Sequence, residues 1–119
     1  MRIQSTGTVT LPMYTMNNKK YIDIELDGKT IETVQKLHES SKKFLRSEKV
    51  VMPLEGSSLK IKIPFRYNRI MCTVKGHKTL YEFAEGDVID FMAEYTGVWT
   101  AGEYCGVAWK LNQVGQSTN

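Results

Sequence analysis

The sequence lacks the features that would place the protein in a membrane or a secretory pathway. No run of apolar residues approaches the roughly 18 that a membrane-spanning helix requires, and residues 1–5 lack the apolar segment of a secretory signal peptide. The chain has 119 residues, close to the usual size of one domain. We therefore expect one domain over residues 1–119, with a short tail at 115–119, inside the cell and without a membrane partner.

Cysteine is scarce and is not spaced for metal binding. The two cysteines, Cys72 and Cys105, do not belong to a CxxC motif. Cys72 and His77 lie five residues apart, but a zinc site there would still lack two ligands. In a reducing compartment these residues are better explained as buried, reduced thiols than as a disulfide. We therefore expect no metal and no cofactor.

Familiar catalytic motifs are absent as well. The chain has no nucleotide-binding P-loop, no HExxH and no GxSxG. Four carboxylates lie close together in the sequence, at Glu82, Glu85, Asp87 and Asp90, but acid–base catalysis also requires a cleft and a shifted pKa. We interpret them as solvated turn charges and His77 as an exposed turn residue, and we expect no enzymatic activity. Convergence of His77, Glu85 and Asp87 in one pocket would change that interpretation.

Acidic residues are almost missing from the middle of the chain. Residues 51–80 carry six Lys or Arg and one acidic residue, whereas residues 81–119 carry one and six. The net charge of +3 hides this asymmetry. Such clustering suits an anion-binding surface, although solvated strand edges protected by lysine explain it equally well. The six basic residues are Lys60, Lys62, Arg66, Arg69, Lys75 and Lys78.

Alternation of apolar and polar residues predicts a mainly β structure. Ile22, Ile24 and Leu26 alternate with polar residues, so this strand has one buried and one wet face. A turn-rich link before it and Gly102 near the end of the chain indicate hairpins. Several short strands with glycine turns and one helix predict an OB-like small β-barrel. The predicted strands cover residues 8–14, 20–26, 59–63, 69–75, 88–96 and 104–114.

The periodicity changes to that of a helix over residues 30–46. Asp27 and Gly28 just upstream suit a cap or a turn. His38 has no second functional residue fixed beside it, so we interpret it as a surface side chain. Whether the helix packs across the barrel or serves an interface stays open. The apolar stripe consists of Ile31, Val34, Leu37, Phe44 and Leu45. The predicted ion pairs are Glu32 with Lys36 and Glu39 with Lys43.

Basic residues share one face of each central strand. Lys60 and Lys62 alternate with aliphatic residues in the first of these strands. The second would present a ring, two cations and two smaller side chains on its outer face. Arginine beside an aromatic ring suits nucleic acid, because the guanidinium binds phosphate while the ring stacks on a base. The residues of that face are Tyr67, Arg69, Met71, Thr73 and Lys75.

Each aromatic ring is either part of the core or a surface on which a base can stack. Trp109 shares its face of the last strand with Val107 and Leu111, so we expect it in the core. Trp99 and Tyr104 flank the last hairpin loop, and the pattern leaves their exposure open. The strongest candidate platform is Tyr67, next to Arg66 and two residues before Arg69. We assign Phe65, Phe83 and Phe91 to packing.

Four short segments carry a resemblance to a known family. Residues 59–68 join a basic and aliphatic strand to Pro-Phe-Arg-Tyr, and residues 85–89 read Glu-Gly-Asp-Val-Ile. Residues 97–99 read Gly-Val-Trp, and residues 106–114 follow the pattern Gly-x-x-Trp-Lys-x-x-Gln-Val. About half of the chain thereby resembles the single-stranded-DNA-binding proteins of large DNA viruses and phages.

The resemblance implies an OB-type viral protein that coats and protects unpaired DNA in replication or recombination without catalysis. Its location would be the cytoplasm or nucleus of a host cell, or the bacterial cytoplasm. Carried over by position, Arg66, Tyr67 and Arg69 would line the groove, and Trp99 and Tyr104 would cap it. Many such proteins recruit replication enzymes through an acidic tail, whereas residues 115–119 carry no charge. With the basic strand residues, the candidate site comprises Lys60, Lys62, Arg66, Tyr67, Arg69, Lys75, Trp99 and Tyr104.

Other interpretations fit the same residues. In a protein-interaction or virion-structural module, the basic strand would dock an acidic partner and the hairpin aromatics would form a hydrophobic interface. RNA could bind the same barrel, because nothing in the sequence indicates a group that distinguishes DNA from RNA by the 2′-hydroxyl. Replication proteins and further copies of this chain also stay open as partners.

Overall fold

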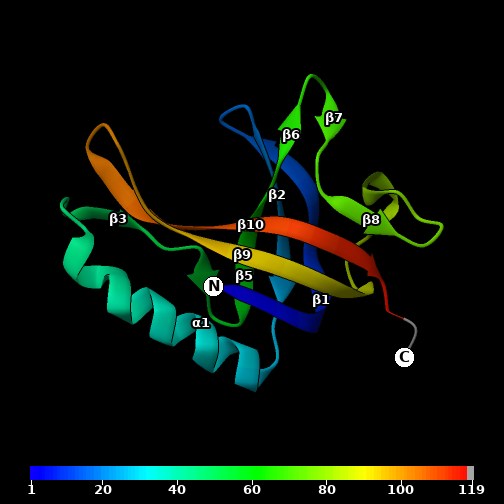
Figure 1. Cartoon of the computed structure of the whole chain (residues 1–119), viewed down its shortest axis with the longest axis horizontal. Helices are drawn as coiled ribbons and strands as arrows, with labels where there is room; N and C mark the ends of the chain where they lie inside the picture. The colour runs from blue at the N-terminus through cyan, green and yellow to red at the C-terminus, as the bar shows by residue number, and fades with distance from the viewer. Residues whose placement is uncertain (118–119) are drawn as a thin grey trace.

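Five long strands and one helix form most of the structure. The computed structural model describes residues 1–117 (Figure 1). The main strands are β1 (Arg2–Met16), β2 (Lys19–Glu25), β5 (Ser58–Ile63), β9 (Val88–Ala101) and β10 (Tyr104–Gln116). The short strands are β3 (Lys49–Val51), β4 (Leu54–Glu55), β6 (Phe65–Arg66), β7 (Arg69–Ile70) and β8 (Thr73–Lys75). The helical elements are α1 (Gly28–Ser41) and the 3₁₀ turns η1 (Lys42–Phe44) and η2 (Leu80–Glu82).

The five long strands close into a ring. β1 pairs with β2 and β9, β2 pairs with β5, and β9 pairs with β10, all antiparallel. The ring closes where β10 meets β5 in parallel, at Lys110 and Lys62. This order confirms the expected mainly β, OB-like barrel with one helix. β10 continues to Gln116, so the tail expected at 115–119 begins inside this strand, and residues 118–119 lie outside the described part.

β1 pairs with two different strands, and it must bend to do so. Its first half pairs with β9 and its second half with β2, and Thr8 has a partner on each side, Val88 and Glu25. At Gly7, next to this junction, an added Cβ would lie 2.5 Å from Ile24 Cγ2 and 2.7 Å from the carbonyl oxygen of Glu25. Only a residue without a side chain fits there, so Gly7 permits the close crossing that shuts the ring.

The inner faces of the strands form the core, as the alternation predicts. Ile22 and Ile24 of β2 are fully buried, and the polar residues between them face outward. Burying each such side chain contributes about 1.5–3 kcal/mol. Trp109 is 1% exposed, which confirms its predicted place in the core. Phe83 and Phe91 are also buried, whereas Phe65 is half-buried.

The helix α1 is shorter than predicted and packs through different residues. It begins after Asp27, whose Oδ1 accepts a hydrogen bond from Thr30 N at 2.7 Å, as an N-cap does. It ends at Ser41, because the chain tightens into η1. Its buried residues are Val34, His38 and Ser41. Phe44, assigned to the apolar stripe, is 56% exposed, so that assignment is wrong.

The charge pattern on α1 also differs from the prediction. Glu39 pairs with Lys42, three residues on, at 2.9 Å rather than with Lys43. Within residues 1–117, Glu32 and Lys36 form no ion pair. The pair of Glu39 with Lys43 assumed an α-helix reaching Arg46, and the 3₁₀ turn changes the side-chain spacing after Ser41. Glu32 and Lys36 both lie within α1 and are exposed, and nothing in the structure explains why they do not pair.

His38 is a structural residue of the interior, and its prediction as a surface side chain is wrong. It is 4% exposed, and its Nε2 accepts a hydrogen bond from the indole N–H of Trp109 at 2.9 Å. The hydroxyls of Ser41 and Tyr95 form a second hydrogen bond at 2.6 Å. Both contacts join α1, along the lower edge in Figure 1, to core-facing residues of β9 and β10. The helix therefore packs across the barrel.

The strand predicted over residues 69–75 is wrong. The chain forms β7 at Arg69–Ile70 and β8 at Thr73–Lys75, with a break between them. β7 pairs with β6 in a separate hairpin, whereas β8 pairs with the end of β10. The five outer residues expected on one face therefore do not share a face. The bond from Met71 N to Pro64 O, at 2.8 Å, closes the hairpin and redirects the chain.

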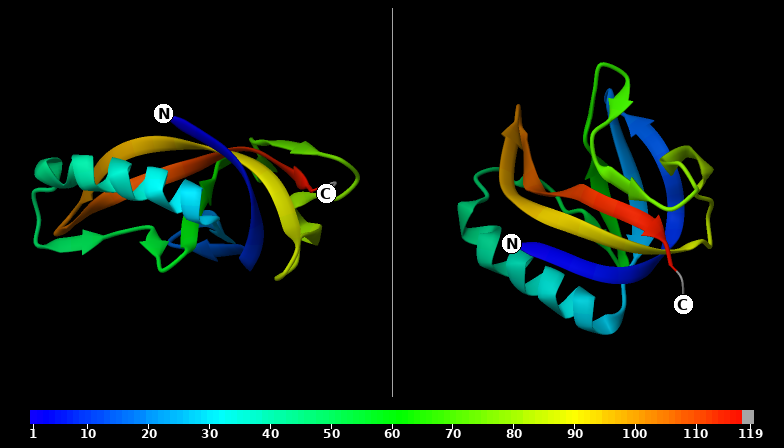
Figure 2. Two further views of the ribbon diagram at one scale, coloured as in Figure 1. Left: turned by 90° about the horizontal axis from the view of Figure 1, so that it is seen from below. Right: turned by 45° about the vertical axis from the view of Figure 1, so that its right-hand side comes forward.

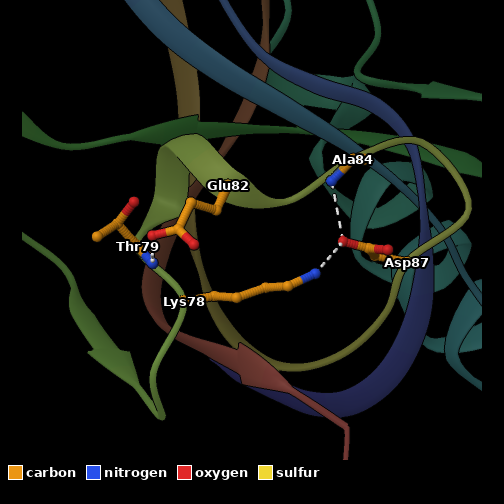
Figure 3. Close-up of polar contacts among 5 residues, drawn as sticks. All are labelled: Lys78, Thr79, Glu82, Ala84 and Asp87. Carbon is orange, nitrogen blue, oxygen red and sulfur yellow. Dashed lines mark hydrogen bonds and ion pairs between the residues drawn. The ribbon is translucent and has the colours of Figure 1, made fainter.

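The loop between β8 and β9 is held by its own polar groups. The carboxylate of Asp87 accepts hydrogen bonds from Lys78 Nζ at 3.0 Å and Ala84 N at 2.9 Å (Figure 3). These bonds hold the pKa of Asp87 below its usual value. Glu82 and Thr79 form a capping box around η2. Asp87 is thus a structural residue, while His77 and Glu85 are exposed.

No helix within residues 1–117 is long and apolar enough to cross a membrane. Cys72 and Cys105 are both free thiols. Cys105 is fully buried and Cys72 half-buried, in agreement with the predicted reduced state.

The His38–Trp109 contact predicts a pH-dependent stability. Nε2 can accept the indole N–H only when the imidazole is neutral, and burial lowers the pKa of His38 below its usual value. The contribution of this contact to the free energy of unfolding should therefore be fully present above about pH 6.5. It should decrease as the pH falls below that value, because the unfolded chain then binds the proton more readily than the folded chain does. Urea unfolding between pH 8 and pH 5 measures this.

Two variants separate the titration from the hydrogen bond. His38→Gln keeps an acceptor for the indole N–H but does not titrate, so its unfolding should lose this pH dependence. His38→Ala leaves the buried donor unpaired, so it should cost about 1–3 kcal/mol above about pH 6.5 and less as the pH falls. An equal pH dependence in the native chain and His38→Gln would contradict the assignment.

Candidate nucleic-acid interface

The most exposed part of the predicted site is the hairpin formed by β6 and β7, which we call the arginine hairpin (residues 65–70). Phe65 pairs with Ile70, and Arg66 pairs with Arg69. Tyr67 and Asn68 form the two-residue turn, with φ of 53° and 62°. Positive φ at both central residues is the geometry of a type I′ turn, which suits the twist of a hairpin. The hairpin projects from the barrel beside the β1–β2 turn (Figures 1 and 2).

The two arginines of this hairpin lie directly opposite each other. Cross-strand partners have Cβ atoms about 4.5–5.5 Å apart, and like charges in such positions repel. Within residues 1–117, neither Arg66 nor Arg69 forms an ion pair with an acidic residue. Both side chains are exposed. The pair therefore presents two uncompensated positive charges at one place, an arrangement that favours an anion.

Tyr67 occupies a position that neither its backbone nor its packing explains. Its side chain is 88% exposed, so burial does not hold it there. The turn between β1 and β2 has nearly the same geometry, with φ of 53° and 64°, but uses Asn17 and Asn18. Asparagine tolerates positive φ, whereas a bulky residue in this region is strained by about 1–3 kcal/mol. The tyrosine ring is thus displayed at a cost in stability.

The arginine hairpin is attached to the barrel next to β2. Lys20 Nζ lies 5.0 Å from the centre of the Phe65 ring, a cation–π contact. This half-buried ring anchors the base of the hairpin, in agreement with its predicted packing role. The hairpin therefore begins where the outer face of β2 and β5 ends.

A continuous row of outward-facing residues crosses the strands at this level. Successive cross-strand partners are Tyr14 with Tyr21, Tyr21 with Lys62, Lys62 with Lys110, and Lys110 with Glu94. The row runs from β1 through β2, β5 and β10 to β9, and all five side chains are exposed or half-buried. We call these five residues the outward row. It places two rings beside two cations on one surface.

The rings of the outward row are held in place by polar contacts. Tyr14 and Tyr21 have ring centres 5.8 Å apart, and Lys60 Nζ lies 4.9 Å from the Tyr21 ring. The Tyr14 hydroxyl donates to Asp23 Oδ1 at 2.7 Å. Burial and this bond raise the pKa of Tyr14, so the phenol stays neutral. Lys60 therefore lies on the same outer surface as the row.

Lys62 is an exposed cation that lies near two other lysines. Burial and the nearby charge of Lys19 lower its pKa. Its cross-strand neighbour Lys110 adds a further like charge. Such crowding of ammonium groups is relieved when an anion binds between them.

Trp99 and Tyr104 lie on the β9–β10 hairpin, away from the arginine hairpin (Figures 1 and 2). Trp99 is half-buried, and an added Cβ at Gly106 would lie 2.9 Å from its ring, so one face of the indole covers this glycine. Tyr104 is 46% exposed, with Lys49 Nζ 5.4 Å from its ring centre. The two rings thus form a second exposed group rather than a cap over Arg66 and Arg69.

The structure divides the eight predicted residues into three places. Lys60, Lys62 and the arginine hairpin share the region around β5 and β6, and Trp99 and Tyr104 share the β9–β10 hairpin. Lys75 lies on β8, opposite Gly115 at the far end of β10. Tyr14, Tyr21 and Lys110 lie in the region around β5 and β6, but the sequence did not predict them as site residues. Alternation puts Tyr21 on the wet face of β2, but the sequence does not show which strands become its neighbours.

Comparison of the chain with protein-family models, with curated proteins and with solved structures finds no match. Within residues 1–117, no three His, Cys, Asp or Glu side chains are grouped so as to hold a metal ion. The chemistry of the site therefore has to be inferred from its cations and rings.

Proposed function

We propose that the protein binds single-stranded DNA and coats unpaired strands during replication or recombination. The observation that carries this proposal is the tip of the arginine hairpin, where an almost fully exposed tyrosine in a strained turn stands beside two unpaired arginines. Neither folding nor packing accounts for this combination. A strand of nucleic acid accounts for both parts, because it offers phosphates to the guanidinium groups and flat bases to the ring.

The path of the strand would follow the outward row. Lys62 and Lys110 neutralise phosphates at the point where β5 and β10 meet, and the arginine hairpin adds two more cations beside them. In OB-type barrels, oligonucleotides bind across the second and third strands and the adjoining loops. Those strands correspond to β2 and β5 in the ring order. The proposed surface thus combines the usual face of such a barrel with a hairpin that extends it.

Affinity would come from two physical terms. Phosphate contacts release counterions, so binding weakens as salt rises. Stacking of a base on an exposed ring contributes about 1–3 kcal/mol and tolerates any base. Single strands are favoured over duplex, because paired bases hide their flat faces. RNA shares this chemistry, and an acidic protein could satisfy the charges alone, so the experiments below separate these ligands.

The first test is direct binding measured by fluorescence anisotropy of labelled oligonucleotides. Oligo-dT should bind with a site of about 4–16 nucleotides, and duplex of equal length should compete less well at 50 and 200 mM salt. A parallel competition with oligo-U reports whether the surface prefers DNA or RNA. Absence of oligo-dT binding at the lower salt would sink the proposal and would favour the protein-interaction alternative.

The arginines should control the salt dependence. Each of Arg66→Ala and Arg69→Ala should weaken oligo-dT binding and reduce the slope of log K against log salt by about 0.7, the value for one phosphate contact on a single strand. Lys36→Ala removes a charge from the exposed side of α1 and should leave the slope unchanged. Slopes identical in all three variants and the native chain would place the binding surface elsewhere.

Tyr67→Asn should separate stability from binding. The variant makes the turn Asn-Asn, as in the β1–β2 turn, so the free energy of unfolding should stay equal or rise by up to about 1 kcal/mol. Loss of the ring should weaken oligo-dT binding roughly tenfold or more. Tyr81→Asn is the matched control, since Tyr81 is 65% exposed on η2 and lies outside the proposed surface. Equal losses in both variants would contradict a specific role for Tyr67.

A further inference from the structure

A cleft opens beside the outward row, between β10 and the link from β7 to β8. Its volume is about 380 Å³, within the range in which proteins hold small organic ligands. Pro64 and Met71, from the links on either side of the arginine hairpin, form an apolar wall. Met92, Glu94 and Asn112 belong to β9 and β10 and form the wall that we call polar. Lys110 belongs both to this cleft and to the outward row. A strand lying along the row would therefore pass its mouth.

The apolar wall suits a flat ring. Met71 follows directly after the arginine hairpin, and its apolar side chain is 59% exposed to water. Thioether sulfur makes favourable contacts with aromatic rings, and methionine adapts its shape to what it covers. Pro64 belongs to the same wall, and Met92 adds apolar surface on β9, so the lining offers apolar side chains against which a base can lie.

The polar wall is built by a bulge in β10. Leu111 pairs with Ala93 and Gln113 with Met92, so Asn112 is an extra residue on β10. A bulge redirects its side chain, and Asn112 Nδ2 donates to Glu94 Oε1 at 3.2 Å. Arg2 Nε lies 3.5 Å from the same oxygen. The hydrogen bond from Asn112 and the ion pair with Arg2 therefore both involve Oε1 of Glu94.

In the described part of the chain, two hydrogen-bond acceptors on this wall are left without partners, next to the donor groups of Lys110 and Gln113. The bond from Asn112 and the charges of Lys110 and Arg2 keep the pKa of Glu94 low, so the carboxylate is ionised. Within residues 1–117, Glu94 Oε2 and Asn112 Oδ1 have no hydrogen-bond partner. A carboxylate repels phosphate but accepts a hydrogen bond from an amino group. The cleft therefore suits a neutral base that carries N–H donors.

We propose that this cleft receives one base of the bound strand and favours bases with an exocyclic amino group, such as cytosine, over thymine. The inference rests on the proposed function, since the strand delivers the base. Cytosine N4 donates to a carboxylate, whereas thymine presents the acceptor O4 at the same place. The cleft thus adds a base preference to a surface that otherwise binds without regard to sequence.

Comparison of oligo-dC with oligo-dT tests the preference, because the two pyrimidines are similar in size. The native chain should bind oligo-dC about tenfold more tightly. Glu94→Met removes the acceptor, so the ratio of its affinities for oligo-dC and oligo-dT should approach one. Glu103, on the distant β9–β10 hairpin, forms an ion pair with Lys49. The control Glu103→Met makes the same change there and should keep the native ratio. Equal native affinities, or a ratio unchanged in Glu94→Met, would overturn the proposal.

Alkylation of Cys72 by iodoacetamide gives a second readout, because this thiol lines the cleft. The experiment uses Cys105→Ser, which leaves Cys72 as the single cysteine. Oligo-dC at ten times its Kd should slow the reaction about tenfold, whereas an abasic oligonucleotide of equal length, also bound, should leave the rate unchanged.

The outcomes distinguish this inference from the proposed function. Binding of oligo-dC without protection of Cys72 would overturn the cleft and leave single-strand binding intact. Protection by the mononucleotide dCMP but not by oligo-dC would assign the cleft to free nucleotides and also overturn it. Failure of every oligonucleotide to bind would remove both proposals.

Discussion

The arrangement depends on the closure of one sheet, and the closure depends on the crossing at Gly7. β1 can pair with β9 and then with β2 only if its backbone passes within contact distance of Ile24 and Glu25. Any side chain at Gly7 would push β1 away from β2. Closure in turn brings β10 against β5, so that Lys62 and Lys110, 48 positions apart in the chain, become neighbours. The outward row and the cleft beside it exist only because the ring shuts.

The parts that we assign to binding are separate from the parts that hold the fold. The core and the contact of His38 with Trp109 lie inside the ring and under α1, whereas the arginine hairpin is a two-stranded extension. An extension with few buried contacts can carry strain and like-charge repulsion without endangering the whole domain. This separation explains how the chain tolerates Tyr67 in a turn that elsewhere uses asparagine, and Arg66 opposite Arg69.

The proposed surface assigns each chemical part of a single strand to a different element. In this proposal, phosphates would contact the cations of the outward row and of the arginine hairpin, and bases would stack on Tyr67 at the tip. The cleft lined by Glu94 and Asn112 adds hydrogen-bond acceptors to this surface, beside the cations Arg2 and Lys110 that also line it. General affinity and base preference would therefore vary independently. The rings of Trp99 and Tyr104 lie apart from this surface, on the β9–β10 hairpin.

The sequence by itself determined the local features: the strands, the burial of Trp109, the cap at Asp27 and the chemistry of Arg66, Tyr67 and Arg69. Alternation and turn chemistry act between near neighbours, so they can be read directly. It misplaced His38 and joined β7 to β8, because the burial of a histidine and the path after a hairpin depend on distant partners. Only the tertiary structure decided that Tyr21, Lys62 and Lys110 share a surface while Trp99 does not, since closure of the ring, not spacing along the chain, selects the neighbours of each strand.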